Sequence, residues 1–265
     1  MREIKIIVCI KQILDPEGSR SSYRIDVLGK KIIPVGIPPV INPYDENALE
    51  AALQLKDNLG VKIVAVNMAE RAALPVLRKA LSVGVNELVV LEDEKFKDLD
   101  SYSTAHVIST AIKRIGEYDI ILVGRQAADW DCGQVGLIIA EILQIPSINL
   151  AQKVRVEDNS VIVEKLKRNG YEVVKAPVPA LITVSNEIGD LRLPSLKAIK
   201  EANKKPVTVW NIADLEIDPK NLETRKIYKL SAPPPAFRKC VFIGGQSPQE
   251  KGENLAVKLK EEGVI

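Results

Sequence analysis

A chain of 265 residues, 46% of them hydrophobic, is long enough for one large domain with an appendage. Lysine and arginine number 37 against 35 acidic residues, so the net charge of +2 gives no electrostatic reason to expect nucleic acid or an anionic membrane as a partner. The single histidine argues against histidine-based metal sites and Ser-His-Asp triads, and Cys9, Cys132 and Cys240 share no C-x-x-C spacing, so we expect no metal and a reducing, cytoplasmic location.

Strand-like and helix-like segments alternate along the chain up to residue 206. Short β-branched runs, typical of buried parallel strands, occupy residues 4–10, 62–67, 87–91, 119–123 and 180–184. Apolar residues recur at three- and four-residue spacing, which is typical of helices, in residues 43–58, 72–83, 103–115 and 135–143. None of these runs has the length of a membrane span, and we expect no transmembrane segment.

Two further segments indicate antiparallel pairs. Residues 24–37 are typical of a polar hairpin, and residues 153–174 alternate around Asp-Asn and Asn-Gly turns. The whole pattern predicts an α/β protein with a three-layer α/β/α architecture and a mostly parallel sheet, Rossmann-like and adenine-nucleotide α-hydrolase-like. We expect residues 1–206 to form this nucleotide-binding domain.

The character of the sequence changes after Pro194. A short basic helix begins at Leu196 and is stopped by Pro206, and residues 212–231 with the proline run 232–235 lack apolar periodicity. A final amphipathic helix is predicted for residues 247–262. We expect residues 207–265 to form an arm and helix that pack on a partner chain.

The loop between the strand-like run at 119–123 and the helix at 135–143 is the strongest candidate for a ligand site. Gly124 falls at the carboxyl end of that strand, where open α/β sheets bind ligands. Gly133 and Gly136 allow close approach of a phosphate, and the helix beginning near Val135 presents free N–H groups to an anion. A plain connection without a ligand fits the same pattern.

Other polar positions are expected at the same edge of the sheet. Asn42 or Asp45 caps the helix that follows, or meets a ribose or base. Residues 100–104 start a helix whose hydroxyls either cap it or contact a phosphate. Asp129 and Asp131 have no proton-transfer partner, so we interpret them as loop-structuring or ligand-positioning groups and predict no catalytic residue.

The chain resembles the β subunit of electron-transfer flavoprotein along nearly its whole length. The resemblance is carried by the opening Ile-Val-Cys-Ile-Lys-Gln12, by Asn42-Pro-Tyr-Asp45, and above all by Gly124-Arg-Gln-Ala-Ala-Asp-Trp-Asp-Cys-Gly-Gln-Val-Gly136. It implies a heterodimer with an α subunit that carries the electron-shuttling FAD, while the β subunit holds AMP or a second FAD. It also implies that Leu196 docks an acyl-CoA dehydrogenase or a similar flavoenzyme.

Matching motif positions assign the nucleotide contacts of this family to residues here. The resemblance implies contacts from Cys9, Asn42, Tyr44, Asp45, Met68, Asp100, Ser101, Thr104, Gly124, Arg125, Gln126, Ala127, Asp129, Cys132, Gly133, Gln134, Val135 and Gly136.

The choice between FAD and AMP depends on two places in the sequence. Members that bifurcate electrons keep FAD in the β subunit, and they resemble this chain at residues 100–104 and 134–136. The chain departs from them at Trp130, where a small residue is usual, and at Cys132, where threonine is usual. We favour an FAD that takes hydride from NADH and bifurcates the electrons; the alternative is AMP bound structurally. An adenylating enzyme is less favoured because no Walker sequence follows the first strand.

Overall fold

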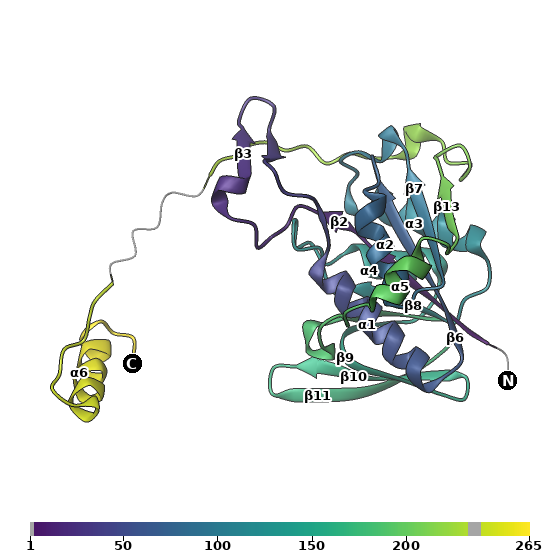
Figure 1. Cartoon of the computed structure of the whole chain (residues 1–265). Coiled ribbons are helices and arrows are strands. Elements are labelled where there is room, and N and C mark those ends of the chain that lie inside the picture. Colours follow the sequence, from purple (N-terminus) through teal and green to yellow (C-terminus); the bar gives the residue numbers. More distant parts are fainter. Residues whose placement is uncertain (1–2, 233–239) are drawn as a thin grey trace. The chain divides into compact units, whose positions relative to one another are not determined.

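The computed structural model describes residues 3–232 and 240–265. Its centre is a nine-stranded sheet in the order β11-β10-β9-β12-β8-β1-β6-β7-β13 (Figure 1). The strands are β1 (Ile4–Ile10), β6 (Val61–Ala69), β7 (Glu87–Glu92), β8 (Ile120–Gly124), β9 (Ser147–Glu157), β10 (Ser160–Lys167), β11 (Gly170–Pro177), β12 (Ala180–Val184) and β13 (Val207–Trp210). All neighbouring strands are parallel except at β10, which is antiparallel to both β9 and β11. The predicted mostly parallel sheet is confirmed.

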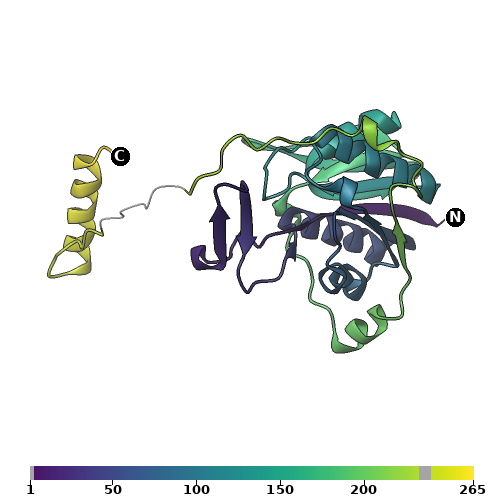
Figure 2. The ribbon, with the colours of Figure 1, turned by 90° about the horizontal axis from the view of Figure 1, so that it is seen from above.

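Helices cover both faces of this sheet. The helices of the unit that holds the sheet are α1 (Pro43–Asn58), α2 (Leu74–Val83), α3 (Ser101–Ile115), α4 (Val135–Leu143) and α5 (Leu196–Ala202). The remaining helix, α6 (Pro248–Glu261), belongs to a separate unit that is described below. Successive side chains of a strand point to opposite faces, so in β1 Ile6 and Val8 pack with α1 and α2, whereas Ile7 and Cys9 pack with α3 and α4. Figure 2 shows the sheet between the blue helices and the teal ones, which confirms the three-layer architecture.

Smaller elements lie in the connections. Two short antiparallel pairs are β2 (Gln12–Ile13) with β5 (Val40–Ile41), and β3 (Tyr23–Asp26) with β4 (Lys31–Pro34). The second pair is the hairpin expected within residues 24–37. Four 3₁₀ helices are η1 (Arg20–Ser22), η2 (Glu94–Phe96), η3 (Asn186–Ile188) and η4 (Pro219–Asn221).

The first compact unit extends beyond the sequence-based boundary at residue 206. It covers Met1–Lys229, and the second unit covers Leu230–Ile265. Strand β13 adds to the edge of the main sheet beside β7, and Leu215 is buried against the α3 side of the core. Residues 212–231, which lack apolar periodicity, thus contribute isolated apolar side chains to the core of this unit. Residues 233–235 of the proline run lie outside the described residues.

The second unit contains α6, in which no described residue is buried. Its packing on a partner subunit stays a prediction. Among residues 3–232 and 240–265, none of the helices combines the length and apolar character that a bilayer-spanning segment needs.

Candidate functional site

A cavity of about 370 Å³ lies at the carboxyl ends of the central parallel strands. Residues that end β1, β6 and β8, such as Ile10, Ala69 and Gly124, line it. Strand β1 lies between β6 and β8, so the chain builds the sheet outward from β1 in both directions. Such a switch point is where open α/β sheets bind ligands.

Most of the residues proposed from the sequence line this one cavity. They are Cys9, Asn42, Asp45, Met68, Ser101, Thr104, Gly124, Arg125, Gln126, Ala127, Asp129, Cys132, Gly133, Gln134, Val135 and Gly136. The other two, Tyr44 and Asp100, are not among the lining residues. The ring of Tyr44 lies 5.2 Å from the guanidinium carbon of Arg125, and Asp100 accepts a hydrogen bond from Ser103 N at 2.7 Å as the N-cap of α3. Contact of the lining residues with a nucleotide remains a prediction.

Asp45 joins two strand ends beneath the cavity. Its buried carboxylate accepts hydrogen bonds from Lys11 N, after β1, at 2.8 Å and from Gly124 N, at the end of β8, at 3.1 Å. A Cβ at Gly124 would lie 2.5 Å from Asp45 Oδ1, so this approach requires glycine. Burial raises the pKa of Asp45 to about 7, against the opposing effect of its hydrogen bonds. Burial also raises the pKa of the neighbouring Cys9 thiol, which is therefore neutral.

Asn42 fixes the loop that follows β8. Its Nδ2 donates to Gln126 O at 2.9 Å, and its Oδ1 accepts from Ala128 N at 3.0 Å. Asn42 occupies the N-cap position of α1 but makes no capping hydrogen bond through its side chain, so side-chain capping, one of the two roles expected for Asn42 and Asp45, is not observed. Both side chains instead hold the walls of the cavity together.

The loop of residues 125–134 is held by its own carboxylates. Lys11 Nζ lies 2.7 Å from Asp129 Oδ2, and Asp131 accepts a hydrogen bond from Gln126 Nε2 at 2.8 Å. These contacts agree with the loop-structuring interpretation of the two aspartates. Gly133 takes a left-handed conformation with φ of +61°, which favours glycine.

Helix α4 begins at the cavity without a side-chain cap. Its N-cap residue, Gln134, makes no capping hydrogen bond through its side chain, and Val135 and Gly136 of the first turn line the cavity. A Cβ at Gly136 would lie 2.5 Å from Val123 Cγ2, so glycine lets this helix start close to the sheet. N–H groups of an uncapped first turn attract an anion.

Several lining residues had not been proposed from the sequence. Lys11, Glu70, Phe96 and Lys97 follow strand ends, and this position is a signal that could have identified them. Arg225 also lines the cavity, from the segment that follows β13. A lone arginine in a segment without periodicity gives no sequence signal for such a contact.

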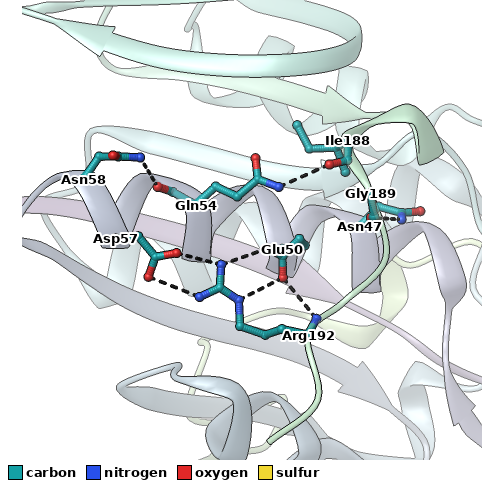
Figure 3. Close-up of polar contacts among 8 residues, drawn as sticks. All are labelled: Asn47, Glu50, Gln54, Asp57, Asn58, Ile188, Gly189 and Arg192. Atoms are coloured by element: carbon teal, nitrogen blue, oxygen red, sulfur yellow. Dashed lines mark hydrogen bonds and ion pairs between the residues drawn. The ribbon is translucent and has the colours of Figure 1, made fainter.

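The expected docking residue, Leu196, lies outside the cavity on a segment anchored to α1. Leu196 is 82% exposed and Leu193 is 90% exposed. Arg192 comes immediately before Leu193 and binds Glu50 and Asp57 of α1, with both Nη2–oxygen distances at 2.8 Å (Figure 3). The two leucines are thus exposed on a segment whose backbone is held in place.

Two further contacts from α1 hold the beginning of this segment. Asn47 Nδ2 donates to Gly189 O at 2.7 Å, and Gln54 Nε2 donates to Ile188 O at 3.2 Å (Figure 3).

Comparison with known proteins relates the whole chain to one family. Residues 31–215 match the electron transfer flavoprotein domain. The chain is 37% identical, over 99% of its length and 100% of the relative's, to the electron transfer flavoprotein subunit beta of Thermoanaerobacterium thermosaccharolyticum. With the same coverage it is 34% identical to the caffeyl-CoA reductase-Etf complex subunit CarD of Acetobacterium woodii and 32% identical to the acryloyl-CoA reductase electron transfer subunit gamma of Anaerotignum propionicum.

Proposed function

This chain belongs to the electron transfer flavoprotein family and is of the β-subunit type, and on that premise we propose that its cavity binds FAD in a heterodimer with an α subunit. The observation that carries the proposal is the uncapped start of α4 at a cavity that the hydroxyl-bearing residues Ser101 and Thr104 also line. Together they offer N–H and O–H donors to the phosphates and the polar chain of a flavin nucleotide.

The charges of the cavity also suit a nucleotide. Lys11 and Lys97 are neutralised by Asp129 and Glu70, respectively. In the described part of the chain, Arg125 makes no ion pair with a carboxylate; its Nε donates to Gln126 Oε1 at 3.3 Å. Arg125 therefore adds positive charge at the cavity, where it supports phosphate binding.

FAD held at the start of α4 and by Ser101 and Thr104 would supply the redox chemistry, which is acceptance of hydride from NADH and transfer of the electrons to different partners. The chain binds and orients it and tunes its potential through hydrogen bonds and local charge. A carboxyl with a raised pKa, Asp45, lies among the lining residues, so the charge that the cavity presents changes near neutral pH. No side chain is required as a nucleophile or a general base.

AMP is the second candidate ligand, and one observation favours it. The cavity volume of about 370 Å³ is near the lower end of the range of ligand pockets, roughly 300–1,000 Å³. A ligand without the isoalloxazine needs less space. In that case the chain holds AMP structurally, and the FAD of the α subunit alone carries electrons.

The proposed partners follow from the exposed apolar surfaces. Helix α6 carries exposed Leu255 and Val257, and we place this helix on the α subunit. Leu193 and Leu196 form the surface proposed for an acyl-CoA dehydrogenase-type flavoenzyme. Two relatives are named as subunits of a caffeyl-CoA reductase complex and of an acryloyl-CoA reductase, which agrees with a partner that acts on an acyl-CoA substrate.

The deciding experiment is the nucleotide content of the complex purified with its α subunit. Denaturing extraction followed by chromatography separates FAD from AMP. Two FAD per heterodimer would support FAD in this chain, and NADH titration would then test hydride transfer. One FAD and one AMP would replace the FAD proposal with the structural AMP reading.

A variant of α3 tests the cavity itself. Thr104→Val removes a lining hydroxyl, and we expect FAD to bind the full-length chain about threefold to tenfold more weakly, as for the loss of one hydrogen bond. Thr110→Val, on the same helix, is the matched control because Thr110 is not among the lining residues and donates to His106 O at 2.9 Å. Equal binding by both variants and the unchanged chain would contradict the proposed site.

A further inference from the structure

Two loops form opposite walls of the cavity. One wall is the loop of residues 125–134 after β8, and the other is the segment of residues 96–101 after β7. In the sheet, β1 and β6 separate these two strands. Neighbouring strands lie about 4.8 Å apart, so the strand ends from which the walls rise are separated by roughly 14 Å.

The segment of residues 222–225 lies against the β7 wall and is fixed there by its backbone. Thr224 forms an antiparallel bridge with Leu99, and Arg225 N donates to Asp98 O at 2.7 Å. Glu223 N donates to Ser103 Oγ at 2.7 Å, at the start of α3. These contacts set the position from which the side chain of Arg225 extends.

Arg225 reaches from this wall to the other. Its guanidinium carbon lies 3.8 Å from the centroid of the Trp130 ring, and both residues line the cavity. Trp130 is 44% exposed, so the stack lies at the rim. Within the described residues Arg225 makes no ion pair, and its side chain has only a long hydrogen bond of 3.4 Å to Leu99 O. The stack on Trp130 is therefore the main contact of its guanidinium.

We propose that the Arg225–Trp130 stack is a clasp that retains a nucleotide in the cavity. This inference rests on the proposed function, because it concerns the ligand of the same site. The clasp joins the two walls at the rim, so a bound nucleotide leaves faster when the stack is absent. A guanidinium stacked on an indole ring gives a directional attraction that an ammonium group does not reproduce in the same geometry.

The test is the dissociation rate of a nucleotide from the full-length chain. The chain is loaded with FAD or with radiolabelled AMP, and release is followed after addition of excess unlabelled ligand. Arg225→Ala and Trp130→Ala should each accelerate release by about threefold to thirtyfold, the range expected for a lost cation–π contact. The double variant should release the ligand no faster than the faster single variant, because both substitutions remove the same contact.

Two further variants separate a clasp from other roles of Arg225. Arg225→Lys keeps the positive charge without the planar group, and it should release the ligand nearly as fast as Arg225→Ala. Arg114→Ala is the matched control, because Arg114 lies 5.0 Å from the centroid of Trp210 and neither residue is among the cavity-lining residues. Its release rate should equal that of the unchanged chain.

Several results would overturn the clasp. They are an unchanged release rate in Arg225→Ala, full rescue by Arg225→Lys, and additive effects in the double variant. Failure of the proposed function is distinguishable, since the unchanged chain would then retain neither FAD nor AMP. If the unchanged chain retains a nucleotide and Arg225→Ala releases it at the same rate, the clasp alone is wrong.

Discussion

Arg192 binds Glu50 in a bidentate arrangement. Its Nη2 lies 2.8 Å from Glu50 Oε1, and its Nε donates to Glu50 Oε2 at 3.1 Å. Glu50 is buried on α1, so its charge depends on this partner. The pair fixes the backbone that carries the exposed leucines proposed for docking.

Replacement of Arg192 by alanine should destabilise the chain. It leaves the buried Glu50 carboxylate without its cation, and we expect the free energy of unfolding to fall by about 2 kcal/mol, since Arg192 itself is partly exposed. Asp57→Ala is the control: its carboxylate is more than half exposed and should contribute less than about 1 kcal/mol. Urea unfolding measures both variants, and equal losses would contradict a special dependence of Glu50 on Arg192.

The buried carboxyl of Asp45 should make stability depend on pH. Burial raises its pKa to about 7 in the folded chain, whereas an aspartate in an unfolded chain titrates near about 3.9. The folded state then binds the proton more tightly. The contribution of Asp45 to stability is full below about pH 4 and is lost as the pH rises through about 7.

Two measurements check the Asp45 prediction. NMR titration of its side-chain carboxyl should give an inflection near pH 7, and Asp45→Asn should lack the corresponding fall in unfolding free energy between about pH 4 and pH 7. An inflection below pH 4 would show that the hydrogen bonds from Lys11 and Gly124 outweigh the burial.

The architecture could be predicted because the central strands are buried on both faces. Residues such as Ile120 to Val123 form an uninterrupted apolar run, which is typical of a parallel strand covered on both faces. Strand β13 was not predicted, because its four residues lie at the sheet edge with no fully buried side chain. Its place depends on pairing with β7, which no local pattern records.

Part of the candidate site was likewise predicted from the sequence, and part of it was not. The loop that runs from Gly124 to Gly136 was predicted because it is continuous in the chain and marked by glycine. The carboxylate of Asp100, a residue assigned to the nucleotide by resemblance, accepts a hydrogen bond from Ser103 N as the N-cap of α3, and its contact with a nucleotide stays a prediction. Arg225 was missed because its position beside Trp130 depends on the bridge between Thr224 and Leu99, which local sequence does not specify.

Gly136→Ala should weaken nucleotide binding. The added Cβ would lie 2.5 Å from Val123 Cγ2, so the first turn of α4 must shift from the sheet, at a cost of about 1–3 kcal/mol in stability. The shift also moves the N–H groups proposed to bind phosphate. Gly252→Ala in α6 is the control, because its Cβ would meet nothing within 4 Å. Equilibrium dialysis with FAD and AMP compares the two variants, and unchanged binding in Gly136→Ala would argue against phosphate at α4.

The three cysteines allow the site to be mapped without a substitution. Cys132 lines the cavity and is exposed, Cys240 is exposed in the second unit, and Cys9 is buried with a raised pKa. A thiol reagent should therefore modify Cys132 and Cys240 in the folded chain and reach Cys9 only on unfolding. Saturation with FAD or AMP should slow modification of Cys132 and leave Cys240 unaffected, as peptide mass spectrometry at timed intervals would record. A nucleotide bound among the residues that surround Cys132 must restrict access to its thiol. If neither FAD nor AMP changes the rate at which Cys132 is modified, the ligand binds elsewhere.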